Sequence, residues 1–249
     1  MSNISLKDTK PFEIGWKALA CSISDIAAMG GEPRYCLVSL GLPRGLDSKF
    51  VESIYKGIKK LAGIFKINIV GGDTNTSDKI IIDVFLAGEA RIHDVIYRSN
   101  ARSGDVIAVT GSLGNSYLSK KHLVFMPRLT EAQFLTRNFK INSMIDISDG
   151  LSSDLNHILE KSRKGALIFE ENIPLVKGAR LENALNDGED FELLFTLSRN
   201  EALRLAKKTE KLPFSISFIG FILNRPKKLI IKNKSGGFMT VKPEGFRHF

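Results

Sequence analysis

The chain has 249 residues, of which 43% are hydrophobic and 25% are charged, so it is long enough for one large domain or two of ordinary size. No apolar run reaches the length of a membrane span, and the first residues lack the apolar core of a secretion signal. Cys21 and Cys36 both lie in apolar stretches, which excludes a disulfide framework. These features predict a cytoplasmic protein without a membrane segment.

The formal net charge of +9 raises the question of a nucleic-acid partner. However, the lysine pairs at 59–60, 120–121, 207–208 and 227–228 are scattered along the chain. No aromatic residues alternate with basic ones, as they would in an RNA-recognition strand. We therefore expect no nucleic-acid binding, and a basic surface that suits phosphorylated small molecules.

A helix is predicted over residues 11–30, with apolar residues on more than one face, so that it is buried nearly all round. Asp25 falls on the same face as Cys21. A buried carboxylate needs a partner or a metal ion. The alternatives to a metal are a hydrogen bond to the next loop and a salt bridge to Lys17 or Arg34.

Residues 67–70 predict a short strand that runs directly into Gly71, Gly72, Asp73 and Thr74. Glycines at a strand end allow the backbone to approach a ligand closely. A carboxylate and a hydroxyl are groups that hold Mg²⁺ beside phosphate. An ordinary turn is the alternative, since Gly and Asp are common turn residues.

A second strand-to-helix junction lies at Asp146-Ile147-Ser148-Asp149-Gly150. Apolar Met144 and Ile145 precede it, and apolar residues at helical spacing follow from Leu151. Acidic side chains at such a junction can hold a cation that itself holds phosphate. The alternative is helix capping by Ser148 or Asp149, with Asp146 as a solvated turn residue.

The remaining elements alternate between strands and helices without strict order, and adjacent strands recur. This pattern predicts an α+β fold of two domains with mixed β-sheets flanked by helices. The polar segment 92–102 marks the boundary, which gives an N-terminal domain over residues 1–96 and a C-terminal domain over 97–249. Further strands are expected at 35–40, 80–86, 105–110, 166–169, 193–196, 215–221 and 228–232, and helices at 50–65, 127–139, 151–159, 181–185 and 200–211.

Several standard catalytic motifs are absent from the sequence. It has no phosphate-binding loop, no dinucleotide fingerprint and no nucleophile elbow, and its four histidines are dispersed. Aspartates recur instead at the ends of elements. Carboxylates brought together from separate elements repel one another unless divalent cations lie between them. Such a site favours phosphoryl transfer, in which positioning and charge neutralisation do most of the catalysis.

Five segments in order also resemble one family: Ser24–Gly30, Gly71–Thr74, Asp146–Gly150, Gly188–Glu192 and the terminal Gly245–Phe249. Together they are similar to thiamine-phosphate kinase, of the aminoimidazole-ribonucleotide synthetase-like superfamily. The resemblance implies ATP-dependent phosphorylation of thiamine phosphate to thiamine diphosphate by direct in-line transfer. It also implies several Mg²⁺ ions, ATP as co-substrate, and a homodimer formed through the N-terminal domain.

The resemblance assigns roles to residues at the matching positions. The implied metal ligands are Asp25, Asp73, Asp146 and Asp149. The implied ATP contacts are Tyr55, Gly72, Asp73, Arg98 and Ser148, and the implied contacts to the thiamine end are Glu189 and Phe246. An aromatic ring can stack on a cationic thiazolium, and a carboxylate suits a cation.

Three features depart from the family pattern. The family has an acidic Asp-Asp-Ala-Ala stretch and a His-Phe motif before the part that matches Pro11–Gly15, so we expect the first domain to be incomplete. The segments 114–127 and 174–188 are short, and Asp187 stands where the family prefers glycine. Two alternatives therefore stay open: a non-catalytic remnant that binds nucleotide or thiamine phosphate, and another ATP-using enzyme of the superfamily.

Overall fold

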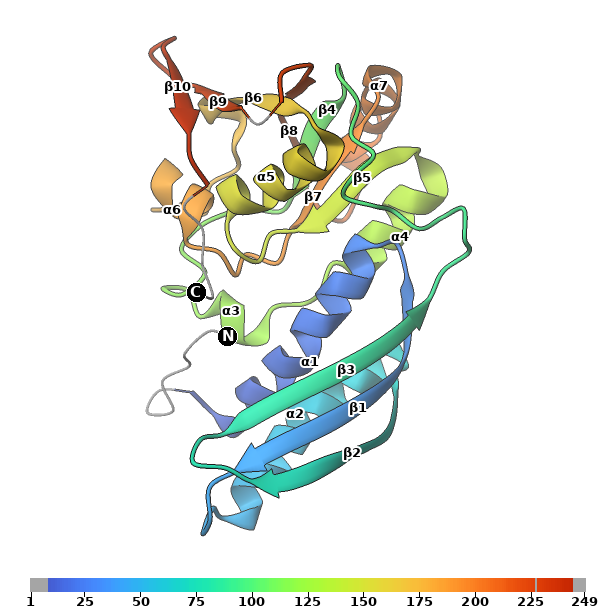
Figure 1. Cartoon of the computed structure of the whole chain (residues 1–249), viewed down its shortest axis with the longest axis vertical. Helices are drawn as coiled ribbons and strands as arrows, with labels where there is room; N and C mark the ends of the chain where they lie inside the picture. The colour runs from blue at the N-terminus through green and yellow to red at the C-terminus, as the bar shows by residue number, and fades with distance from the viewer. Residues whose placement is uncertain (1–8, 227, 244–249) are drawn as a thin grey trace.

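The computed structural model describes residues 9–226 and 228–243, and it contains two β-sheets with helices packed against them (Figure 1). Phe246 lies outside the described residues. The expected α+β class with two mixed sheets is confirmed. Among the helices described here, none is both long enough and apolar enough to cross a membrane.

The N-terminal half forms a three-stranded sheet in the order β2-β1-β3, with β2 parallel and β3 antiparallel to the central strand. Burial alternates along β1, as expected for a sheet that is covered on one face. The elements are α1 (Pro11–Ala28), β1 (Glu32–Leu42), α2 (Ser48–Phe65), β2 (Asn68–Thr76) and β3 (Ile81–Glu89).

Helices α1 and α2 pack closely because each has a glycine at their crossing point. A Cβ atom on Gly15 would lie only 1.9 Å from the backbone oxygen of Ile54, and one on Gly57 only 2.0 Å from that of Phe12. No larger side chain fits at either position without moving a helix. This contact fixes α1 between α2 on one side and the second sheet on the other (Figure 1).

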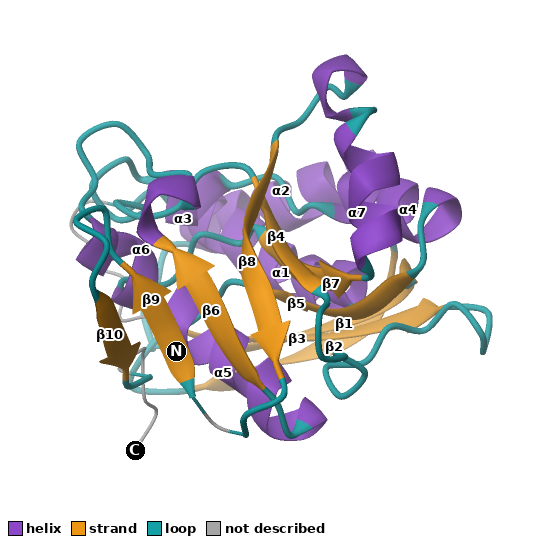
Figure 2. Cartoon of the chain, turned by 90° about the horizontal axis from the view of Figure 1, so that it is seen from above, coloured by secondary structure: helices purple, strands orange, loops and turns teal. Residues whose placement is uncertain are grey.

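The C-terminal half forms a seven-stranded sheet in the order β10-β9-β6-β8-β4-β7-β5, with β5 next to α1 (Figure 2). All its pairings are antiparallel except the one between β6 and β9. Its strands are β4 (Val106–Thr110), β5 (Ile141–Asp146), β6 (Gly165–Phe169), β7 (Leu193–Leu197), β8 (Ile216–Leu223), β9 (Leu229–Lys232) and β10 (Phe238–Val241), and its helices are α3 (Lys121–Val124), α4 (Leu129–Asn138), α5 (Leu151–Ser162), α6 (Leu181–Asn186) and α7 (Arg199–Ala206).

Both faces of the central strands of this sheet are covered. Along β4, Val106 and Ala108 belong to the core shared with α1 and α4, whereas Ile107 and Val109 belong to the core under α5. Strands β4, β5 and β7 are therefore buried at every position. Burial on two faces explains their nearly continuous apolar sequence.

One expectation about the elements was wrong, and two short elements were not predicted. Strand β2 continues to Thr76, so that Gly71 to Thr74 lie inside a strand and not in a turn after it. Helix α3 and strand β10 were not predicted, because each has only 4 residues and too few positions to show a period.

Candidate functional site

One face of α1 presents polar side chains to the C-terminal half. Lys17, Cys21, Ser24 and Asp25 follow one another at helical spacing, so they form a single stripe. The Nζ atom of Lys17 lies 2.5 Å from Oε2 of Glu189, and the hydroxyl of Ser24 donates a 2.6 Å hydrogen bond to Oδ2 of Asp146. The stripe therefore connects two loops of the other half of the molecule.

Asp146 ends β5 directly opposite this stripe and is buried. Burial, together with the negative charge of nearby Asp25, raises the pKa of Asp146 to about 6, while the Ser24 hydrogen bond opposes the shift. Desolvation also raises the pKa of Asp25. The two carboxylates therefore share a region that disfavours two negative charges unless a cation is present.

The expectation that Asp25 sits on a buried face was wrong, because its side chain is exposed. The described ion pairs of Lys17 and Arg34 are with Glu189 and with Glu32 and Glu89. The positive charge near Asp25 and Asp146 comes from Arg98, which lowers the pKa of both carboxyl groups. Arg98 is exposed, and its backbone oxygen accepts a hydrogen bond from Ser162.

Gly150, and not Ser148 or Asp149, is the N-cap residue of α5, and no side chain caps the helix from that position. The capping alternative was therefore wrong in its residues. Asp149 instead donates a hydrogen bond from its backbone N–H to Oδ2 of Asp154, on the first turn of α5, at 2.9 Å. A Cβ at Gly150 would approach the backbone oxygen of Leu185 to 2.5 Å, so only glycine fits there.

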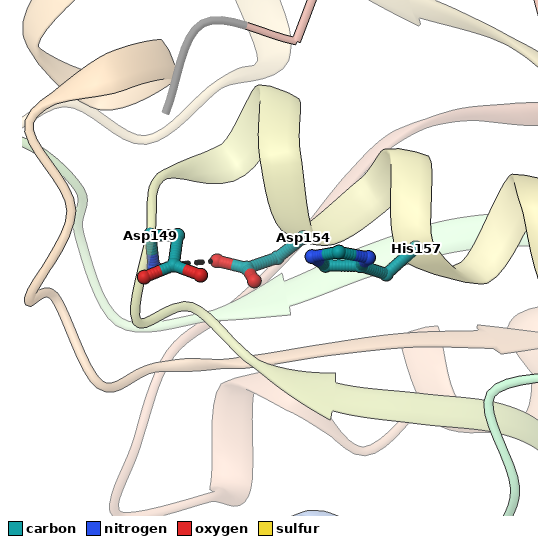
Figure 3. A group of neighbouring side chains, drawn as sticks. All are labelled: Asp149, Asp154 and His157. Carbon is teal, nitrogen blue, oxygen red and sulfur yellow. Dashed lines mark hydrogen bonds between the residues drawn. The ribbon is translucent and has the colours of Figure 1, made fainter. Parts of the chain in front are cut away.

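Asp154 and His157, on the first turns of α5, join Asp149 in a group whose possible ligand atoms all lie within 4.8 Å of one another (Figure 3). Burial raises the pKa of Asp154 to about 8, and the backbone N–H of Asp149 opposes this shift. Among the described residues, no other group of at least three His, Cys, Asp or Glu side chains has this spacing. Sequence analysis missed Asp154 and His157, although both follow Asp149 at positions that return to one side of the helix start.

The loop that follows α6 lies alongside the 146–150 loop. The N–H of Glu189 donates to the backbone oxygen of Ser148 at 2.7 Å, and the N–H of Phe191 donates to that of Ile147 at 2.8 Å. Glu189 has a positive φ of 56°, an uncommon conformation for a residue with a side chain. The backbone thus brings Ser148 and Glu189 together.

The carboxylate of Glu189 faces Lys17 on α1 and Tyr117 in the loop before α3. Burial, together with the charge of Glu189, raises the pKa of Tyr117 to about 12. The hydroxyl of Ser116 donates to the backbone oxygen of Glu189 at 2.6 Å. Sequence analysis missed Lys17 and Tyr117 as neighbours of Glu189, because the contacts span residues far apart in the chain.

Behind Glu189, two buried acids anchor the same loop. Asp190 accepts hydrogen bonds from the N–H of Gly114, and burial raises its pKa to about 7. Glu192 pairs with Arg128 at 2.7 Å and with Lys121 at 2.8 Å. Burial raises the pKa of Glu192, but the bonds and charges of Arg128 and Lys121 together outweigh burial, so the net shift of the pKa is downward.

Asp73 and Gly72 lie on exposed positions of β2. Asp73 accepts hydrogen bonds from the N–H of Thr74 and the side chain of Asn75, both of which are local. A Cβ at Gly72 would lie 1.8 Å from the backbone oxygen of Val38, which explains the glycine by strand packing. No described hydrogen bond or ion pair joins Asp73 to Asp25, Asp146 or Asp149.

Tyr55 lies on α2 and is half-buried. It lines a cavity of about 540 Å³ together with other residues of the same helix, namely Ser48, Val51, Glu52, Lys56 and Lys59. The described structure thus brings together Asp25, Asp146, Arg98, Ser148, Asp149 and Glu189, and no described contact joins Tyr55, Gly72 or Asp73 to them.

Comparisons with known proteins agree over nearly the whole chain. Residues 1–90 match the family described as AIR synthase related protein, N-terminal domain, and residues 102–244 match the C-terminal domain of the same description. The thiamine-monophosphate kinase of Buchnera aphidicola subsp. Schizaphis graminum (strain Sg) is 36% identical over 98% of this chain and 83% of its own length. That of Bacillus subtilis (strain 168) is 33% identical over 99% of this chain and 84% of its own length.

A solved structure described as AaThiL complexed with AMPPCP and TMP is similar throughout. It superposes with a TM-score of 0.85 at 31% sequence identity, and the match covers 98% of this chain and 82% of that chain. The likeness therefore includes both sheets and the loops between them.

Proposed function

The chain belongs to the thiamine-monophosphate kinases, a family built from the two AIR synthase related domains, and on this premise we propose that it transfers a phosphoryl group from ATP to thiamine phosphate. The product is thiamine diphosphate, and the transfer is direct and in line. The observation that carries the proposal is the polar stripe of α1 in the N-terminal half, since it contacts both Asp146 and Glu189 of the C-terminal half.

The donor set suits Mg²⁺, which prefers carboxylate oxygens and retains water and phosphate oxygens in its shell. Asp146 is buried, lies near Asp25 and has a raised pKa, so a bound cation would relieve the cost of ionising both groups. We assign Asp25, Asp146 and Asp149 as ligands of the Mg²⁺ ions, with Asp73 contributing from β2. When bound, the ions supply neutralisation of phosphate charge.

Arg98 and Ser148 are proposed to contact ATP beside these carboxylates. Arg98 already lies near the acidic pair, and a guanidinium suits a phosphate oxygen. Ser148 lies beside Asp149 in the 146–150 loop, so it can contact the same phosphates. Gly72 and Tyr55 complete the proposed nucleotide contacts from β2 and α2.

Glu189 and Phe246 are proposed to bind the thiamine end of the acceptor. A carboxylate opposite the permanently charged thiazolium supplies electrostatic attraction, and an aromatic ring supplies stacking. The attacking atom is a phosphate oxygen, which is already anionic, so these residues need only position it and no strong general base is required.

A homodimer is proposed to form through the N-terminal domain, whose boundary we place at residues 96 and 97. The face of the first sheet that lies away from α1 and α2 exposes Tyr35, Leu37, Ile81 and Phe85. Leu37 and Phe85 are directly opposite each other in neighbouring strands, so the apolar side chains form one patch. Patches of this kind mark protein–protein contacts.

The test is product formation by variants of the acidic pair. Asp146→Asn and Asp25→Asn should each lower the rate of thiamine diphosphate formation by at least about 100-fold, because losing one charged ligand of the metal ions costs several kcal/mol of transition-state stabilisation. Asp78→Asn, at an exposed turn, is the matched control and should retain the wild-type rate. Full activity of folded Asp146→Asn at ordinary Mg²⁺ concentrations would contradict the assignment.

A further inference from the structure

Lys17 is a buried charge on a helix that otherwise contributes mainly apolar side chains to the core. Its side chain is 7% exposed, and that of its partner Glu189 is 13% exposed. The two residues come from different halves of the molecule and are 172 positions apart in the sequence. The ion pair is therefore made only when α1 is docked against the C-terminal half.

Stability alone does not explain a lysine at this position. Removing two charges from water costs about as much as their attraction returns, and well-packed apolar side chains of similar size often replace a buried ion pair without loss. The four-carbon stem of lysine packs like the side chain of methionine. The charged end of Lys17 therefore needs another explanation.

The surroundings of Glu189 supply that explanation. Its backbone is fixed by hydrogen bonds to Ser148 and from Ser116, but these bonds leave the rotation of the side chain free. The carboxylate itself is contacted by Lys17 from α1 and by Tyr117 from the loop before α3. Tyr117 is 47% exposed and packs against the tilted ring of His122, with ring centroids 4.6 Å apart, so it forms the open side of this contact.

We propose that Lys17 is the positioning residue for Glu189: its ammonium group holds the carboxylate aimed at the place where the cationic heterocycle of the acceptor binds. The proposal rests on the function proposed above. The N-terminal half thereby contributes to acceptor binding through a residue that does not itself touch the acceptor. The thiamine pocket is then complete only when both halves are docked.

This role makes a specific kinetic prediction. Lys17 acts through Glu189 on the heterocycle, which is present in the ground state and in the transition state, so its loss should raise KM and leave kcat nearly unchanged. The loss should weaken thiamine and thiamine phosphate equally, because the two ligands share the heterocycle. A lysine that bound the phosphate directly would affect thiamine phosphate alone.

The experiment compares Lys17→Met, Lys17→Arg, Glu189→Gln and the double variant by calorimetric binding of thiamine and thiamine phosphate and by steady-state kinetics. Lys17→Met should weaken both ligands by about 10-fold, the effect of one charge-assisted hydrogen bond, with kcat within about threefold. Lys17→Arg should recover most of the loss. In the Glu189→Gln background, Lys17→Met should cause no further loss. Lys10→Met, at the exposed start of α1, is the matched control and should bind both ligands as the wild type does.

Three results would overturn the proposal: unchanged affinity in Lys17→Met, a loss confined to thiamine phosphate, or equal losses with and without Glu189. Lys17→Gln, which keeps a hydrogen-bond donor, replaces the methionine variant if that variant does not fold by circular dichroism, and the same predictions apply to it. These outcomes are separate from failure of the proposed function. In that case the wild-type protein itself would neither bind thiamine phosphate nor form thiamine diphosphate.

Discussion

The two sheets of this molecule are covered to different extents. The central strands of the seven-stranded sheet are buried at every position between α5 on one face and α1 and α4 on the other. The three-stranded sheet has helices on one face only, and β2 is exposed at nearly every residue. The larger sheet is thus enclosed by helices from both halves of the molecule, whereas the smaller sheet leaves one face exposed.

The ion pairs of the two regions also differ in burial. In the C-terminal half, Glu192 is fully enclosed and bonded to Arg128 and Lys121. In the N-terminal half, Arg34 pairs with Glu89 on the surface. Buried pairs lose much stability when one partner is removed, while exposed pairs contribute little.

Breaking the buried pair should therefore have the largest effect. Arg128→Met leaves Glu192 enclosed with only Lys121 as a cationic partner among the described residues, and it should lower the free energy of unfolding by about 3 to 5 kcal/mol. Arg34→Met is the matched control and should not change stability measurably. Chemical denaturation of both variants tests the difference, and equal losses would contradict the contrast between the two regions.

The second effect is a pH dependence that comes from Asp190. Burial raises the pKa of Asp190 to about 7 in the folded chain, whereas in the unfolded chain its pKa is the ordinary 3.8. The stability that this protonated group contributes is fully present below pH 3.8 and is lost as the pH rises through about 7. Asp190→Asn keeps an acceptor for the Gly114 N–H without the charge.

We expect Asp190→Asn to gain stability relative to the wild type by up to about 4 kcal/mol between pH 4 and 8, taking about 1.4 kcal/mol per tenfold change in protonation equilibrium. Urea denaturation across this pH range gives the difference between the two proteins. A difference that stays constant with pH would show that Asp190 is ionised in the folded chain throughout.

The smallest effect on folding should come from the uncovered face of the first sheet. Leu37→Ser combined with Phe85→Ser removes apolar surface that is already exposed, so the stability of one chain should change by less than about 1 kcal/mol. The oligomeric state should change instead, from dimer to monomer in sedimentation velocity. Lys60→Ser, on the exposed side of α2, is the control and should sediment as the wild type does. A wild-type monomer at micromolar concentration would rule out this contact.

The sequence predicted the fold class and most elements because the apolar periods of α1, α2 and the buried strands are long. It failed where local and tertiary constraints compete. Gly71 and Gly72 suggested a turn, but the close approach of Val38 to Gly72 accounts for a glycine within a strand. Asp25 was expected to be buried because its helix is apolar on several faces, yet it lies on the exposed part of the polar stripe.

The candidate site could also be predicted only in part, because some of its residues stand in local motifs and others are defined by tertiary contacts. Asp146, Asp149 and Glu189 stand in recognisable local motifs, so single segments of sequence could identify them. Lys17 and Asp154 could not be identified in this way, since only the folded structure shows that Lys17 pairs with Glu189 and that Asp154 bonds to Asp149. Those partners are set by the docking of α1 and by the geometry of the 146–150 loop.

The central claim is that the polar stripe of α1 and the loops opposite it form the site of phosphoryl transfer to thiamine phosphate. The most direct measurement follows ATP and thiamine phosphate by phosphorus NMR in the presence of Mg²⁺ and the wild-type protein. We expect thiamine diphosphate and ADP to appear in equal amounts, and neither to appear when Mg²⁺ is removed by a chelator. Release of inorganic phosphate from ATP with thiamine phosphate left unchanged would contradict the account.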